Sequence, residues 1–280
     1  MTVLVTGASG KVGRRVVDAL TRRGRRVRPG SRRSAVRLDW ADPATWQQAL
    51  DGVESVFLLV PGGDDGHRSV AGVGERVVSF VEAAESAGVG KIVLMTALGM
   101  QYAPAEVEQR AVELRVIGGA MSWTVLRPNW FFQNLTEGPL RALAEAADGT
   151  LRVPCGDAAV SFIDARDIAD AAAEALLGAH GGREYDLTGP DSLTFAEVAG
   201  RCARATLPIR GYEPVDDEGF RQAAAALGWD GDYIDTVSGL FAAIASGAAA
   251  DVTDDVPALL GRPAYHLDDF LLGLPPEQGR

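Results

Sequence analysis

The stretch VLVTGASGKVG, residues 3–13, decides the fold, because three apolar residues run directly into glycines at positions 7, 10 and 13. Residues 3–5 are typical of a buried strand, and residues 11–23 carry apolar side chains at helical spacing. In such a strand–turn–helix the glycines allow a tight turn, a close approach of a pyrophosphate and close helix–sheet packing. The helix N-terminus adds N–H groups and a favourable dipole for an anion. We therefore expect a dinucleotide site at Gly7, Ala8, Ser9, Gly10, Lys11, Val12 and Gly13. A glycine-rich turn without a ligand is the alternative.

The rest of the N-terminal half alternates short apolar runs with helix-period segments, which indicates a parallel sheet with crossover helices. We expect strands at residues 3–5, 25–28, 36–38, 55–60, 91–96 and 123–126. Helices are expected at residues 11–23, 43–50, 74–87 and 106–117. The fold class predicted from this pattern is α/β, with a doubly wound parallel sheet.

The second half is less regular and predicts a small C-terminal α/β cap over the sheet. Helices are expected at residues 140–147, 164–177, 193–205, 217–227, 231–246 and within 265–274. Strands are expected at residues 160–163, 184–187 and 208–213. We interpret residues 1–280 as one unit, with residues 1–150 mainly the dinucleotide-binding core. Residues 151–280 would form mainly the cap, with interleaved core strands.

Composition excludes several classes of protein. The 280 residues hold 27 Lys+Arg against 38 Asp+Glu, a formal charge of −11 that argues against a nucleic-acid binder. The two cysteines, Cys155 and Cys202, exclude a disulfide scaffold and a CxxC motif. No histidine, cysteine or carboxylate spacing indicates a metal site. We find no signal peptide and no apolar stretch long enough for a bilayer, and expect a cytoplasmic monomer or homodimer.

The segment after the second expected strand bears on the choice of cofactor. A site for NAD usually has an Asp or Glu there, yet no carboxylate occurs before Asp39. Ser31, Arg32 and Arg33 suit a 2′-phosphate, because a planar guanidinium can bind it in a bidentate way. The prediction is therefore NADP(H), although these arginines also fit a solvated surface. Asp39 is a candidate acceptor for the adenine amino group or an ordinary helix cap.

Several pieces, in a fixed order, carry a resemblance to a known family. They are residues 6–13 (TGASGKVG), 38–40 (LDW), 57–61 (FLLVP), 123–134 (WTVLRPNWFFQN), 162–169 (FIDARDIA) and 187–190 (LTGP). The chain resembles the NmrA-like branch of the atypical short-chain dehydrogenases/reductases. The similar subgroup includes NAD(P)H:quinone oxidoreductases, triphenylmethane reductases and EasG-type enzymes. The resemblance implies a Rossmann core, a small C-terminal substrate region and NADP(H).

One departure from the wider superfamily concerns its Tyr-x-x-x-Lys pair, in which Tyr protonates a carbonyl oxygen. Here the residue four positions after Tyr102 is Glu106, and Gln109 stands near the place of the Lys. The usual acid machinery is therefore absent. Many relatives in this branch also lack the pair, and some bind cofactor only as sensors.

Other candidates follow from the carboxyl edge of the expected sheet, where a doubly wound fold binds its ligand. Leu59, Val60, Pro61, Thr96 and Pro128 complete the expected cofactor site. Candidates for catalysis are Thr96, Tyr102 and His67, with a strand-end residue, a lid and an exposed loop histidine as the respective alternatives. The expected substrate pocket contains Asn129, Trp130, Phe131, Trp229 and Tyr233.

These features predict an NADPH-dependent reductase that transfers hydride to a small aromatic or conjugated electrophile such as a quinone, enone or iminium, with secondary metabolism as one setting. Electrophiles of this kind need little acid assistance, which fits the missing pair. Two alternatives stay open. One is a non-catalytic NADP(H) redox sensor that binds a protein partner, and the other is an NADP-dependent, redox-neutral isomerase or epimerase.

Overall fold

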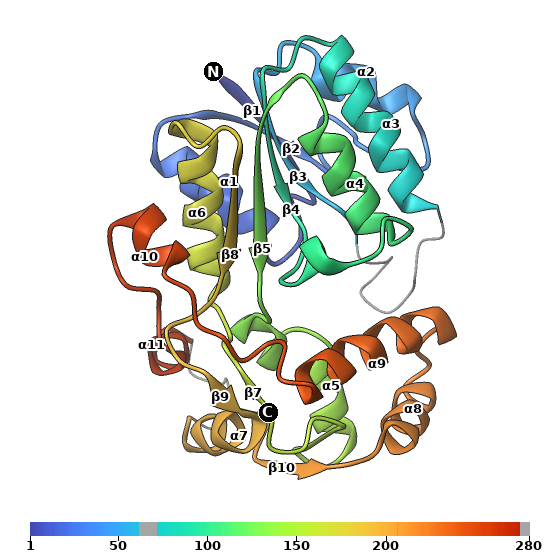
Figure 1. Cartoon of the computed structure of the whole chain (residues 1–280), viewed down its shortest axis with the longest axis vertical. Helices are drawn as coiled ribbons and strands as arrows, with labels where there is room; N and C mark the ends of the chain where they lie inside the picture. Colours follow the sequence, from blue (N-terminus) through green and yellow to red (C-terminus); the bar gives the residue numbers. More distant parts are fainter. Residues whose placement is uncertain (62–71, 206, 275–280) are drawn as a thin grey trace.

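The computed structural model describes residues 1–61, 72–205 and 207–274. A six-stranded parallel sheet runs through it in the order β2-β1-β3-β4-β5-β8 (Figure 1). Its strands are β1 (Thr2–Thr6), β2 (Arg26–Gly30), β3 (Ser55–Leu59), β4 (Lys91–Met95), β5 (Ser122–Pro128) and β8 (Arg183–Leu187). The strand order reverses between β1 and β3, and a ligand crevice forms at such a point. The expected doubly wound α/β class is confirmed.

The sheet is buried on both faces because its strands are apolar at successive positions. Val3 and Val5 of β1 face one helical layer, and Leu4 faces the other. The first layer contains α1 (Gly13–Arg22), α6 (Ala165–Leu177) and α10 (Asp255–Leu260). The second contains α2 (Ala44–Leu50), α3 (Val73–Ser86) and α4 (Glu108–Ile117), so that the two layers flank the sheet in Figure 1. The carboxyl ends of the strands are left for a ligand.

A smaller cap lies beyond those carboxyl ends, in the lower half of Figure 1. It contains η2 (Phe132–Leu135), α5 (Pro139–Ala146), β6 (Thr150–Val153), β7 (Ala159–Val160), β9 (Leu193–Thr194), α7 (Phe195–Arg204), β10 (Gly211–Pro214), α8 (Asp217–Ala226), α9 (Gly231–Ala245) and α11 (Leu267–Leu272). The cap has its own apolar core, in which the Phe220 and Phe241 rings meet edge to face at 5.0 Å. No helix in the described part of the chain is long and apolar enough to cross a membrane.

Three expectations about local structure are wrong. Residues 36–38 form no strand; Arg37 makes one isolated bridge to Ser31, and Leu38 is buried without sheet pairing. The expected strand at residues 160–163 shrinks to β7 plus a single bridge between Ile163 and Phe131. The helix α10 was not expected at all, because its six residues are too few to show a helical period.

Candidate active site

The glycine turn between β1 and α1 is shaped for an anion. A Cβ built on Gly13 would lie 2.1 Å from the carbonyl oxygen of Gly7, so only glycine allows this close packing. The Gly10 N–H donates to that same carbonyl at 2.9 Å and closes the turn. No acceptor within the described residues takes the backbone N–H groups of Lys11, Val12 and Gly13. These groups at a helix N-terminus therefore fit a diphosphate.

Neighbouring strand ends support the turn from the other side. The hydroxyl of Thr6 accepts the Leu59 N–H at 2.8 Å, which ties the end of β1 to β3. A Cβ on Gly7 would lie 2.8 Å from Leu59, so this side chain packs directly on the turn. Val60 is buried, and Pro61 is the last described residue before the gap at 62–71. The structure thus brings these predicted cofactor residues to one edge of the sheet.

The loop after β2 gathers the residues expected at a 2′-phosphate. Ser31 and Ser34 share a hydroxyl hydrogen bond of 2.7 Å, while Arg32 and Arg33 are exposed. Asp39 accepts the Ala41 N–H and a 2.6 Å bond from Arg37. The pKa of Asp39 is lowered by that backbone hydrogen bond, and by the positive charges of Arg37 and Arg32. Serine, arginine and carboxylate therefore form one polar cluster, apart from the cavity at β4 and β5.

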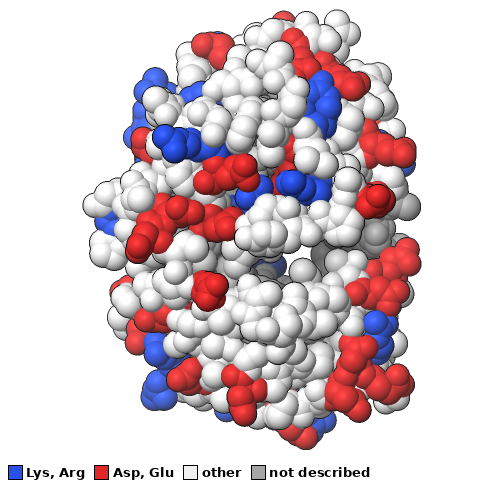
Figure 2. All heavy atoms as spheres, viewed as in Figure 1, with Lys and Arg blue, Asp and Glu red and all other residues white. Residues whose placement is uncertain are grey.

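A cavity of about 670 Å³ lies where the carboxyl ends of β4 and β5 meet the cap. Figure 2 shows the surface hollowed between these two halves of the molecule. The cavity is lined by Lys11, Thr96, Ala97, Gln109, Pro128, Asn129, Trp130, Phe131, Asn134, Glu137, Gly138, Pro139, Tyr233, Thr236, Val237 and Leu240. Its volume is in the range that holds a small organic molecule.

Aromatic side chains bound the cap side of the cavity. Trp130 stacks on Phe241 with ring centroids 5.3 Å apart and an interplanar angle of 19°. Burial raises the pKa of the Tyr233 hydroxyl, so this group stays neutral near pH 7. Asn129 spends both amide hydrogens inside the protein, on the Ser161 hydroxyl and the Ala249 carbonyl. Asn129 therefore fixes the shape of the wall rather than offering its amide hydrogens to a ligand.

Thr96, at the end of β4, is tied to a buried ionic cluster. Its hydroxyl donates to Glu113 Oε1 at 2.5 Å, and Arg127 donates to both oxygens of the same carboxylate at 2.9 and 3.0 Å. Burial alone would raise the pKa of Glu113, but hydrogen bonds from Arg127, Thr96 and Arg110 outweigh it and lower that pKa. Because the carboxylate is ionised, it accepts the Thr96 proton. Thr96 can therefore offer only an acceptor oxygen to a ligand.

Three of the expected site residues do not line the cavity. Tyr102, in η1 (Met100–Tyr102), is 85% exposed and lies outside the cavity lining, so a role for it in proton transfer stays a prediction that requires η1 to move. Trp229 packs inside the cap against Phe220 and Tyr233. His67 lies outside the described residues. The described residues contain no cluster of three metal-ligating side chains.

Several lining residues were missed by the sequence analysis. Asn134 was quoted in the segment 123–134 without a role, and Gln109 was noted only for its place in the Tyr-x-x-x-Lys comparison. Glu137 and Gly138 follow η2, in a stretch without a sequence motif. Glu113 had one usable signal, a charged residue on the face of α4 that carries the buried Val112 and Val116.

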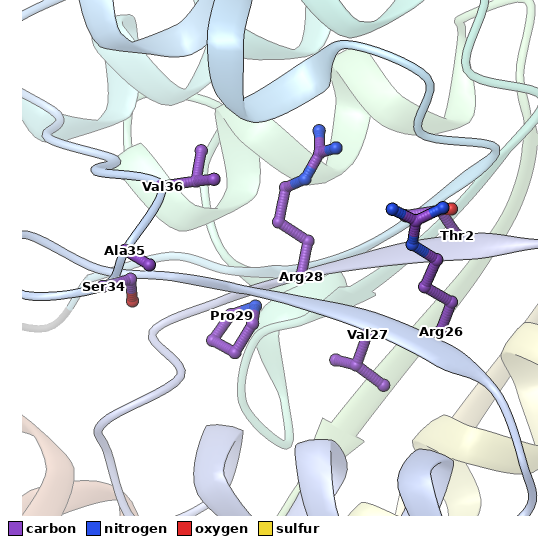
Figure 3. Close-up of a pocket in the computed structure, with 8 residues that line it drawn as sticks. All are labelled: Thr2, Arg26, Val27, Arg28, Pro29, Ser34, Ala35 and Val36. Atoms are coloured by element: carbon purple, nitrogen blue, oxygen red, sulfur yellow. The ribbon is translucent and has the colours of Figure 1, made fainter.

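A second hollow, of about 360 Å³, lies along the edge strand β2 and is shown in Figure 3. Arg28 in this hollow donates to three carbonyl oxygens at the end of α2, those of Gln48, Ala49 and Asp51. Its guanidinium therefore stabilises the end of a helix. The hollow is lined by neither the glycine turn nor the carboxyl ends of β4 and β5, so we do not place the chemistry there.

Comparisons with known proteins agree with this geometry. Residues 7–177 match a family described as NAD(P)H-binding. An NAD(P)H azoreductase from Xenophilus azovorans is 32% identical over 285 residues, 96% of each chain. A (4-alkanoyl-5-oxo-2,5-dihydrofuran-3-yl)methyl phosphate reductase from Streptomyces griseus is 32% identical over 290 residues, also 96% of each. The structure of an Escherichia coli NADPH-dependent quinone oxidoreductase complexed with NADPH has a TM-score of 0.81 at 21% identity, covering 97% of this chain and 99% of that one.

Proposed function

From the premise that the chain belongs to the NAD(P)H-binding family and is an NAD(P)H-dependent oxidoreductase, we propose that it passes hydride from NADPH to a flat, conjugated small molecule. The membership agrees with the resemblance drawn from the ordered sequence pieces. The observation that carries the proposal is the cavity beside the glycine turn, which has aromatic residues on its cap side.

The glycine turn supports binding of the cofactor diphosphate. Its three N–H groups at Lys11, Val12 and Gly13 point to an anion, and the close packing of Gly13 keeps them in place. We assign the preference for NADPH to Ser31, Arg32 and Arg33, which follow β2 where a carboxylate would select NAD. Asp39 remains a candidate for the adenine amino group.

The cavity supports orientation of the acceptor beside the reactive ring. The bound cofactor supplies the hydride, and the protein supplies a fixed geometry and an enclosed site. Thr96, Pro128 and Asn129 lie at the strand ends where the nicotinamide is expected, while Trp130 and Tyr233 bound the cap side. A flat ring fits against these aromatic faces.

The hydrogen-bond arrangement favours acceptors that tolerate hydride addition without an adjacent acid. Thr96 gives its proton to Glu113, and the place of the usual Lys is held by Gln109, which lines the cavity. Quinones, azo compounds, enones and iminium ions spread or offset the developing charge. The names of the two relatives at 32% identity are consistent, because one reduces azo compounds and the other an unsaturated oxo-dihydrofuran that carries a phosphate.

The test is a steady-state assay of NADPH oxidation at 340 nm with a panel of quinones, azo dyes, enones and iminium salts. We expect turnover with at least one class, and weaker binding of NADH than of NADPH in calorimetry. Tight NADPH binding with no oxidation across the panel would favour the sensor alternative. Product formation without net cofactor oxidation would favour the isomerase alternative. Absence of binding of either nucleotide would refute the proposal.

A further inference from the structure

The side chain of Lys11 leaves the glycine turn and reaches the cap, where it forms part of the cavity wall. Its ammonium donates to Asn134 Oδ1 at 3.0 Å, and no second acceptor among the described residues takes its other N–H groups. An ammonium carries three donors, so two are left for a ligand. Burial lowers the pKa of this ammonium, which reflects its partial removal from water.

The backbone opposite Lys11 leaves space for the ammonium. A Cβ built on Gly138 would lie 2.6 Å from Lys11 Nζ, and the φ angle of Gly138 is +155°. Any other residue at this position would therefore displace the ammonium from the wall. Both Gly138 and Asn134 line the same cavity, so the space around Nζ is continuous with the expected substrate site.

The charges at this end of the cavity are predominantly positive. Glu137 is the carboxylate nearest to Lys11, but it pairs with Arg14 at 2.5 Å and is approached by Arg15 at 3.6 Å. Three cations thus face one carboxylate, in a chain whose formal charge is −11. Because the groups are partly buried, their attraction for an anion is screened less than on an open surface.

We propose that Lys11 is a specificity-determining residue that binds an anionic substituent of the acceptor, such as a sulfonate, phosphate or carboxylate. This proposal rests on the proposed reductase function and names the class of its substrate. The cofactor diphosphate is expected on the backbone N–H groups of the turn, whereas Nζ lies against Asn134 and Gly138 of the cap. A flat ring held by Lys11 at one end would lie against Trp130 and Tyr233 at the other.

The decisive experiment measures binding of matched aromatic probes to the protein–NADP⁺ complex by calorimetry. The probes are 2-naphthalenesulfonate and 2-naphthol, which share a ring system and differ in charge. We expect wild type to bind the sulfonate more tightly. Lys11→Met should weaken the sulfonate about tenfold to a hundredfold, the range for a hydrogen bond to a charged group, and leave 2-naphthol unchanged. Lys11→Arg should keep most of the preference.

Asn134→Ala is the matched control, because it removes the partner of the ammonium and leaves the charge. The variant should retain the preference for sulfonate. The proposal is refuted if wild type shows no preference, or if Asn134→Ala loses it as fully as Lys11→Met, since the lysine would then only hold the cap. It is also refuted if Lys11→Met weakens NADP⁺ and leaves the preference intact. Lys11→Gln replaces Lys11→Met if the latter fails to fold, as checked by circular dichroism.

A turnover arm separates this proposal from the proposed function. With 1,4-naphthoquinone and its 2-sulfonate as acceptors, Lys11→Met should raise the KM of the sulfonate alone. If neither quinone is reduced while the binding preference persists, the reductase function fails for quinones and the anion site stands. If both are reduced with KM values that Lys11→Met does not change, the anion site fails and the reductase function stands.

Discussion

The closeness of Gly13 to Gly7 makes Gly13→Ala the sharpest test of the cofactor site. The new Cβ would lie 2.1 Å from the Gly7 carbonyl oxygen and 2.6 Å from its carbon, so the turn has to open. Opening the turn misplaces the N–H groups of Lys11, Val12 and Gly13. If two charge-assisted hydrogen bonds to the diphosphate are lost, binding weakens by about 3–6 kcal/mol. That corresponds to a Kd for NADPH about 10²- to 10⁴-fold higher.

The assay is calorimetric titration with NADPH, together with thermal unfolding to show that the variant is folded. Gly10→Ala is a graded variant, since its Cβ would lie 3.3 Å from the same oxygen, and it should give a smaller loss. Gly239→Ala is the control, because that glycine in α9 has nothing within 4 Å of its Cβ position. A folded Gly13→Ala protein that binds NADPH as tightly as wild type would refute the assignment of the diphosphate to this turn.

Three further predictions concern other parts of the site. Replacing both Arg32 and Arg33 with alanine should raise the Kd of NADPH at least about tenfold and leave that of NADH unchanged, since only NADPH carries the 2′-phosphate; equal losses for both nucleotides would contradict this. Glu113→Gln should lower the free energy of unfolding at pH 7 by about 3 kcal/mol, because buried Arg127 loses its ionised partner. Since the pKa of Glu113 is lowered in the fold, its contribution is present above the ordinary pKa and disappears as pH falls through the lowered one, so urea unfolding should show a smaller difference near pH 3. The exposed pair of Arg152 and Glu213 gives the control Glu213→Gln, expected within about 1 kcal/mol of wild type at both pH values. Leu240→Trp should lower kcat/KM for three-ring acceptors about tenfold by crowding the cavity, with Leu272→Trp, on exposed α11, as its control; equal effects of the two would count against the cavity as the substrate site.

Much of the fold follows from local signals in the sequence. Glycine spacing after an apolar run predicts β1, the turn and α1 within one or two residues. Helix α6 begins where expected, and Asp164 caps it by accepting the Arg166 N–H. Residues 36–38 show where such signals fail. Leu38 is apolar because it is buried in the core, and no periodicity distinguishes that burial from pairing in a sheet.

The site was less predictable because its parts come from distant segments. Lys11 meets Asn134 across 123 positions, and no local pattern connects a glycine turn with η2. Trp229 and Tyr233 stand four residues apart, and their rings lie 5.3 Å from each other. Yet one packs in the cap core and the other lines the cavity. Which face of a cap segment borders a ligand depends on how the cap is docked, which composition does not encode.

The proton inventory of the cavity connects the missing Tyr-x-x-x-Lys pair with the class of acceptor. Glu113 is ionised and fully buried, so the Thr96 hydroxyl has to donate to it and cannot protonate a substrate oxygen. Tyr233 has a raised pKa, which makes it a weaker acid than an ordinary tyrosine. A simple ketone accumulates charge on one oxygen during hydride addition and requires an acid there. A conjugated or cationic acceptor does not, so rapid reduction of an unactivated ketone would show that the acid lies outside the groups placed here.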